Sequence, residues 1–94
     1  MKKMELFYVF NKNLEIVTEK KVSVIIDEAN DIVHFVRQLE MDIINLMLKP
    51  ITLEDIYKNL SQTYEGCIKE DICEFINELL EKNIVTSFED VQKG

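Results

Sequence analysis

Residues 69–82 read KEDICEFINELLEK, and this stretch has the clearest periodicity in the chain. Apolar residues recur at helical spacing on one side, while acidic residues and an asparagine cover the other. The apolar side consists of Ile72, Cys73, Phe75, Ile76, Leu79 and Leu80. The pattern predicts a helix over residues 69–82. The apolar side of this helix is wide. Either the whole side is deeply buried, or one of its edges packs on the core while the other lines a groove.

Two further helices are predicted before this one. Residues 39–48 carry apolar side chains at helical spacing, and Pro50 ends that helix because proline cannot continue it. Thr52 is a suitable N-cap for the next helix, and Asp55 lies where an acidic side chain favours a helix N-terminus. This second helix is expected to end before Gly66, which can adopt a left-handed conformation.

The first third of the chain has strand-forming residues. Candidate strands are residues 5–10 (ELFYVF), 14–17 (LEIV), 22–26 (VSVII) and 31–37 (DIVHFVR). Residues 27–30 form a turn-like break, so the last two strands are predicted to form a hairpin that the first strand joins. Residues 84–86 indicate a short terminal strand or an extended cap, and residues 89–94 are expected to fray. The predicted class is α+β: a two- to three-stranded antiparallel sheet followed by three helices.

Length and composition are those of one small globular domain over residues 1–94. The chain is 47% hydrophobic and 31% charged, with a formal net charge of −7. No apolar run approaches the ~18–20 residues that span a bilayer, and no signal-peptide pattern follows the first residues. These features predict a cytoplasmic protein that does not bind membranes.

The residues that carry most enzyme chemistry are scarce. One histidine and two cysteines, Cys67 and Cys73, do not match the ligand spacing of a zinc site. The two cysteines are expected to be reduced in a cytosolic protein, although a disulfide is an alternative. Two glycines cannot build a glycine-rich phosphate loop. We therefore expect no enzymatic activity, no cofactor and no metal.

Charge is distributed unevenly along the chain. Residues 1–22 have a net charge of +2, residues 23–63 of −4 and residues 64–94 of −5, and Arg37 is the only arginine. Nucleic-acid-binding proteins usually present a basic face, so this distribution argues against nucleic acid as a partner. The acidic half could instead attract a basic partner segment, or its carboxylates could simply be solvated.

The order of segments resembles a known family. VSVIID, a turn and DIVHFVRQLEMDIINLM resemble two strands leading into a helix, and KPITLEDIYKNLSQTY resembles the family's second-helix segment. IKEDICEFINELLEKNIV resembles its third helix, with the spacing Asp71, Phe75, Leu79 and Ile84. On these residues, about 20–86, the chain resembles the PqqD-like family, also called the RiPP recognition element. Lys49-Pro50 stands where the family has an acidic residue followed by glycine. Asn83 stands where the family has a glycine after its third helix.

The resemblance implies a winged helix-turn-helix-like domain without catalysis of its own. Such a domain binds the leader of a ribosomally made precursor peptide as an added strand and presents it to a separate enzyme. The implied peptide-binding residues are Asp31, Ile32, Val33, His34, Phe35, Val36 and Arg37 on the strand, with Ile72, Cys73, Ile76 and Leu80 on the helix. Alternation leaves open whether Ile32, His34 and Val36 or the intervening residues face the groove.

Several alternatives stay open at this point. His34 either contacts the leader or is a half-buried strand residue, and Arg37 pairs with a leader carboxylate or with acids of its own helix. The enzyme partner implied by the family is a radical SAM maturase, a lasso-peptide protease and cyclase, or a cyclodehydratase. The competing functions are a winged-helix DNA-binding regulator and an accessory docking subunit. A homodimer through an unpaired edge strand is also an alternative.

Overall fold

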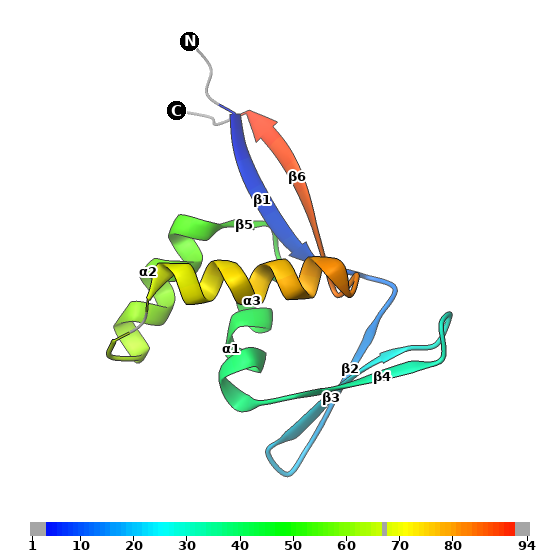
Figure 1. The fold of residues 1–94 in the computed structure, drawn as a ribbon. Coiled ribbons are helices and arrows are strands. Elements are labelled where there is room, and N and C mark those ends of the chain that lie inside the picture. The colour runs from blue at the N-terminus through cyan, green and yellow to red at the C-terminus, as the bar shows by residue number, and fades with distance from the viewer. Residues whose placement is uncertain (1–3, 67, 92–94) are drawn as a thin grey trace.

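The computed structural model describes residues 4–66 and 68–91, which form an α+β fold (Figure 1). The elements are β1 (Met4–Phe10), β2 (Glu15–Glu19), β3 (Val22–Asp27), β4 (Ile32–Val36), α1 (Gln38–Leu46), β5 (Ile51–Thr52), α2 (Leu53–Thr63), α3 (Lys69–Glu81) and β6 (Val85–Val91). The predicted class is confirmed: a three-stranded antiparallel sheet precedes three helices.

The first sheet has the order β2-β3-β4, which confirms the predicted hairpin. The β3–β4 turn is held by the carboxylate of Asp27. This carboxylate accepts hydrogen bonds from the Asn30 backbone N–H at 3.3 Å and from the Asn30 side-chain amide at 2.8 Å. The local side-chain turn expected from the Asp and Asn residues is therefore present.

The second sheet has the order β5-β1-β6, and it corrects the prediction that β1 joins the hairpin. β1 pairs with β6 along its whole length, from Met4 opposite Val91 to Phe10 opposite Val85. The expectation that the tail frays from residue 89 is also wrong for residues 89–91, which belong to β6; residues 92–94 lie outside the described residues. In the view of Figure 1, β1 and β6 project above α3, while β2, β3 and β4 lie below it.

Tertiary contacts explain why β1 pairs with β6 and not with the β3–β4 hairpin. The Phe10 backbone N–H donates to the carbonyl of Met47 at 2.6 Å, and the next backbone N–H donates to the carbonyl of Ile84 at 2.9 Å. Further along the ribbon, the rings of Phe7 and Phe88 stack with centroids 5.6 Å apart. These partners are distant in sequence, so strand pattern alone cannot assign them.

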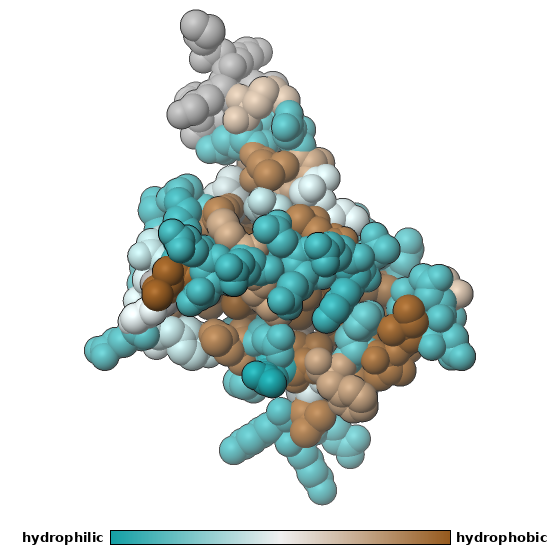
Figure 2. Space-filling model, in the orientation of Figure 1, coloured by the Kyte–Doolittle hydropathy of each residue, from teal (hydrophilic) through white to brown (hydrophobic). Residues whose placement is uncertain are grey.

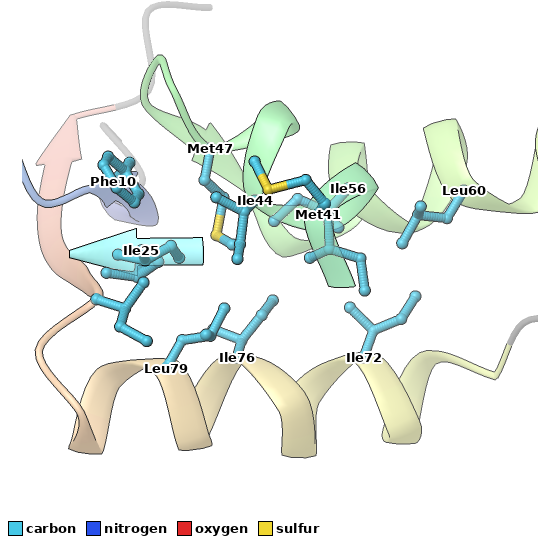
Figure 3. Close-up of a cluster of buried hydrophobic side chains, with 13 residues drawn as sticks. Phe10, Ile25, Met41, Ile44, Met47, Ile56, Leu60, Ile72, Ile76 and Leu79 are labelled. Atoms are coloured by element: carbon cyan, nitrogen blue, oxygen red, sulfur yellow. The ribbon is translucent and has the colours of Figure 1, made fainter. Parts of the chain in front are cut away.

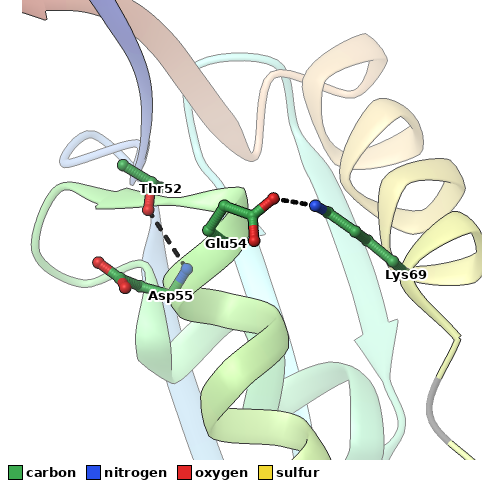
Figure 4. A network of polar contacts seen from close by, with 4 residues as sticks. All are labelled: Thr52, Glu54, Asp55 and Lys69. Carbon is green, nitrogen blue, oxygen red and sulfur yellow. Dashed lines mark hydrogen bonds and ion pairs between the residues drawn. The ribbon is translucent and has the colours of Figure 1, made fainter.

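Capping hydrogen bonds define where α1 and α2 begin. Glu40 accepts a hydrogen bond from the Arg37 backbone N–H at 3.0 Å at the start of α1. The predicted N-cap Thr52 is confirmed, since its hydroxyl accepts from the Asp55 backbone N–H at 3.3 Å (Figure 4). Figure 4 also shows the ion pair between Glu54 and Lys69, which joins the first turns of α2 and α3.

The core lies between α3, the other two helices and the inner face of β3. From α3, Ile72, Ile76 and Leu79 point toward the side chains of α1 and α2 (Figure 3). The buried apolar residues are Phe10, Ile25, Met41, Ile43, Ile44, Met47, Ile56, Leu60, Ile72, Ile76, Leu79, Ile84 and Val85. The helical periodicity of residues 69–82 is thus explained by one buried face.

The C-terminus of α3 ends in a Schellman motif. The Ile84 N–H donates to the carbonyl of Leu79 at 2.9 Å, and the Asn83 N–H donates to the carbonyl of Leu80 at 3.1 Å. Asn83 has a φ of 59°, in the left-handed region where glycine is common. This turn reverses the chain from α3 into β6.

We expect Asn83→Ala to lower the free energy of unfolding by about 1 kcal/mol, because alanine adopts the left-handed conformation less readily than asparagine. Asn83→Gly should leave stability unchanged or raise it, since glycine has no Cβ to clash. Urea unfolding of both variants checks this. Equal destabilisation by both substitutions would show that the asparagine side chain, rather than backbone conformation, stabilises the turn.

Candidate functional site

β4 lies at the end of the β2-β3-β4 sheet, so its outer edge is unpaired within the described part of the chain. The strand alternation settles which face turns inward. His34 lies opposite the fully buried Ile25 and is half-buried, as is Val36, whereas Phe35 is 81% exposed and Val33 53% exposed. The inner face is therefore that of Ile32, His34 and Val36.

β4 is the least protected of the longer edge strands. Its five residues, IVHFV, carry no Asp, Glu, Lys or Arg, whereas the edge strands β2 and β6 each carry two acidic residues. Charged residues on an edge strand discourage pairing with another chain. Among these edges, β4 therefore has the residue composition best suited to accept a further strand.

A narrow groove of about 40 Å³ separates β4 from α3. It is lined by Phe75, Glu78 and Leu79 of α3, by the α3 C-cap Lys82, and by His34, Phe35 and Val36 of β4. Position 31 has a left-handed φ of 55° in the turn before β4, and Arg37 caps the following helix through its backbone. The predicted strand segment thus borders the predicted helix.

The structure brings other residues of α3 to β4 than the resemblance implied. Ile76 is 1% exposed and belongs to the core, and Ile72 is buried as well. Cys73 and Leu80 are half-buried and line none of the described cavities beside β4. The apolar arc identifies the residues that pack, but not the rotation of the helix against the strand, so Phe75, Glu78 and Lys82 were missed.

A larger cavity of about 390 Å³ lies between the start of α1, the end of α2 and the start of α3. Its lining residues are Leu39, Glu40, Ile43, Leu60, Tyr64, Glu65, Gly66, Ile68, Asp71, Ile72 and Phe75. Glu40 and Phe75 line the β4–α3 groove as well, so the groove and the cavity adjoin. We refer to this space as the three-helix cavity.

Tyr64 joins two walls of the three-helix cavity. Its hydroxyl donates a hydrogen bond to the carboxylate of Asp42 on α1. Because the bond holds the proton on the phenol, it raises the pKa of Tyr64 above its usual value. The bond therefore ties the end of α2 to α1 at neutral pH.

This hydrogen bond gives a pH-dependent prediction. A raised folded-state pKa contributes stability that is fully present below the ordinary tyrosine value of 10.0 and is lost as the pH rises through the folded-state pKa. Tyr64→Phe should therefore be less stable than wild type near neutral pH, and this difference should shrink in alkaline solution. Urea unfolding of wild type and variant, at neutral and at alkaline pH, measures this difference in stability. A difference that stays constant between the two conditions would contradict the assigned hydrogen bond.

The outer side of the β2-β3-β4 sheet is apolar over β3 and β4, and Glu15 and Glu19 on β2 border this apolar surface. Val17, Val24 and Phe35 lie opposite one another across the three strands. The apolar outer face consists of Val17, Val22, Val24, Ile26, Val33 and Phe35. Figure 2 shows hydrophilic residues across α3, and both apolar and hydrophilic residues below them, where Figure 1 places β3 and β4. Apolar patches of this kind mark interaction sites on soluble proteins.

Other chemistry finds little support in the described residues. Within residues 4–66 and 68–91, no group of three or more His, Cys, Asp or Glu could hold a metal ion. Cys73 is a free thiol, while Cys67 lies outside the described residues. Burial raises the pKa of Tyr8, and the charge interaction with Cys73 raises it further. No helix in the described part is long and apolar enough to cross a membrane.

Comparisons with protein-family models, with curated proteins and with solved structures find no match to this chain. The function must therefore be inferred from the edge of β4, the β4–α3 groove and the three-helix cavity, together with the residue patterns of the sequence.

Proposed function

We propose that this protein is a non-catalytic peptide-binding module that captures an extended peptide on the edge of β4. The observation that carries the proposal is the unpaired, uncharged edge of β4 beside the β4–α3 groove. A peptide added there extends the three-stranded sheet by one strand. Its backbone hydrogen bonds supply affinity, and its alternate side chains lie beside the β4–α3 groove, which at about 40 Å³ is too small to enclose one of them.

The exposure of β4 supports this proposal. Phe35 is 81% exposed, although burial of such a side chain typically stabilises a protein by about 1.5–3 kcal/mol. An edge strand with this composition also exposes the protein to aggregation. A peptide that covers the edge removes the risk of aggregation, and an enzyme docked on the outer face buries Phe35. Both give a physical reason for the uncharged sequence of β4.

The class of peptide follows from the resemblance to the RiPP recognition element. We propose that the peptide is the leader of a ribosomally synthesised precursor and that a separate maturation enzyme modifies the rest of it. Within this proposal the winged helix-turn-helix-like part comprises β3, β4 and the three helices. The apolar outer face, which adjoins the β4 edge, is where the enzyme docks next to the captured leader.

The charges of α3 favour a peptide over DNA as the partner. α3 and its C-cap carry Lys69 and Lys82 against five acidic residues, and Lys69 is already paired with Glu54. A helix that reads the major groove relies on attraction to phosphates, which this balance opposes. The regulator hypothesis from the sequence therefore gains no support from the geometry.

A binding titration tests the proposed function. The N-terminal half of a short peptide encoded beside the gene is labelled and titrated into the protein. Dissociation constants in the nanomolar to low-micromolar range, about −8 to −12 kcal/mol, are expected for a leader. Absence of binding by any neighbouring peptide to the folded protein would count against the proposal, and salt-sensitive binding of duplex DNA would replace it.

A further inference from the structure

The three-helix cavity has an apolar floor and an apolar mouth. Ile43, Leu60 and Ile72 are buried core residues that form its floor. At its mouth, Leu39 is 48% exposed and Ile68 is 56% exposed. Sites that bind small molecules typically enclose about 300–1,000 Å³, and 390 Å³ lies at the lower end of that range. The space suits one large apolar side chain or two smaller ones.

The polar residues around this cavity have one sign of charge. Glu40, Glu65 and Asp71 contribute carboxylates, and no lysine, arginine or histidine is found among its described lining residues. Glu40 already accepts a hydrogen bond from the backbone N–H of Arg37, the N-cap of α1. Glu65 is exposed after α2, and Asp71 is exposed in the first turn of α3. An apolar space with a negative rim complements an apolar side chain that has a cation beside it.

We propose that the three-helix cavity selects the peptide captured on β4: it takes a large aliphatic or aromatic anchor side chain, and Glu65 and Asp71 pair with a Lys or Arg within two positions of that anchor. This inference rests on the proposed function, because the cavity adjoins the β4–α3 groove through Glu40 and Phe75. Strand alternation places residues two apart on one side of the peptide, which allows anchor and cation to face the protein together.

A peptide of this chemistry is favoured over a second copy of the chain. Each copy carries a net charge of −7, so two copies oppose each other electrostatically at an acidic rim. The last third of the chain also has few basic residues, with three in residues 64–94. A short basic and apolar peptide meets no such opposition, and it fits the dimensions of the cavity.

A selection experiment identifies the preferred peptide directly. A random library of short peptides displayed on phage is selected against the wild-type protein. Enriched sequences are expected to combine Leu, Ile, Phe or Trp with a Lys or Arg within two positions. The most enriched sequence is then synthesised with a fluorescent label, and its dissociation constant is measured by anisotropy at low and at high salt.

Two matched pairs of variants test the rim and the mouth of the cavity. Glu65→Gln with Asp71→Asn should weaken binding about three- to ten-fold and reduce its salt dependence, since each exposed ion pair is worth up to ~1 kcal/mol. Glu70→Gln with Glu74→Gln changes the net charge equally outside the cavity and should alter affinity less than about two-fold. Leu39→Ser should weaken binding about five-fold or more, whereas Leu48→Ser, at a similarly exposed residue outside the cavity, should not.

The outcomes separate this inference from the proposed function. Peptides that bind equally well to the rim and mouth variants, but fail to bind when β4 is altered, would overturn the cavity assignment and leave strand capture in place. Enrichment of acidic peptides would likewise overturn the predicted selectivity. If the folded protein enriches no peptide at all, both the cavity assignment and the proposed function are wrong.

Discussion

Proline at one of two neighbouring positions in β4, Val33→Pro or His34→Pro, is expected to weaken peptide binding at least about ten-fold while the protein stays folded. In an antiparallel sheet, successive residues direct their N–H groups to opposite sides of the strand. One of these two N–H groups therefore faces β3 and the other faces the free edge. Proline at the edge-facing position removes a donor that the added strand needs, and edge strands tolerate such a residue.

The pair of variants contains its own folding control. The proline that interrupts the β3–β4 ladder should lower stability in urea unfolding, and the other should leave the circular dichroism spectrum unchanged. Val17→Pro on β2, the opposite edge of the same sheet, is the matched control for peptide binding. If both β4 variants fold and bind the labelled peptide as well as wild type does, strand addition at β4 is excluded.

Ile76→Ala is expected to lower the free energy of unfolding by about 2–5 kcal/mol. Ile76 is 1% exposed and points from α3 into the core that it shares with α1 and α2 (Figure 3). Natural domains have a total stability of about 5–15 kcal/mol, so this loss is a large share of the whole. The neighbouring Asn77 is exposed, and Asn77→Ala should change stability by no more than about 0.5 kcal/mol.

Chemical denaturation measures this effect, and peptide binding by the folded fraction shows which role Ile76 has. The structure predicts that Ile76→Ala, under conditions where it is folded, binds peptide nearly as well as wild type does. A variant with full stability and lost binding would instead support a binding role for Ile76 in the groove, as the family resemblance implied. The two measurements together decide between core and binding surface.

The features that sequence predicted correctly depend on contacts between near neighbours in the chain. The helix over residues 69–82 and the N-cap at Thr52 are local: each is set by side-chain spacing or a short hydrogen bond. The turn between β3 and β4 belongs to the same group, because Asp27 bonds to a residue three positions away. These elements could be read from sequence because their stabilising partners lie within a few residues.

The candidate site was predicted only in part. The sequence identified β4 as a strand beside α3, but it left the inner face open and placed Cys73, Ile76 and Leu80 at the groove. The three-helix cavity was not foreseen, because its lining comes from three helices whose relative positions no local pattern defines. Its acidic residues carried a signal in the negative charge of residues 64–94, although a solvated surface explained that charge equally well.

The amino-acid sequence by itself determined the three helices, the first four strands and their order, since hydrophobic period, caps and turns act over a few residues. It did not predict β5 or the full length of β6. Only the tertiary structure decided that β1 pairs with β6, that α3 turns Phe75 rather than Cys73 toward β4, and that a cavity adjoins the groove. The physical reason is that these features arise from packing between segments far apart in the chain. One apolar stripe can bury itself in several ways, and the choice among them depends on all of its partners at once.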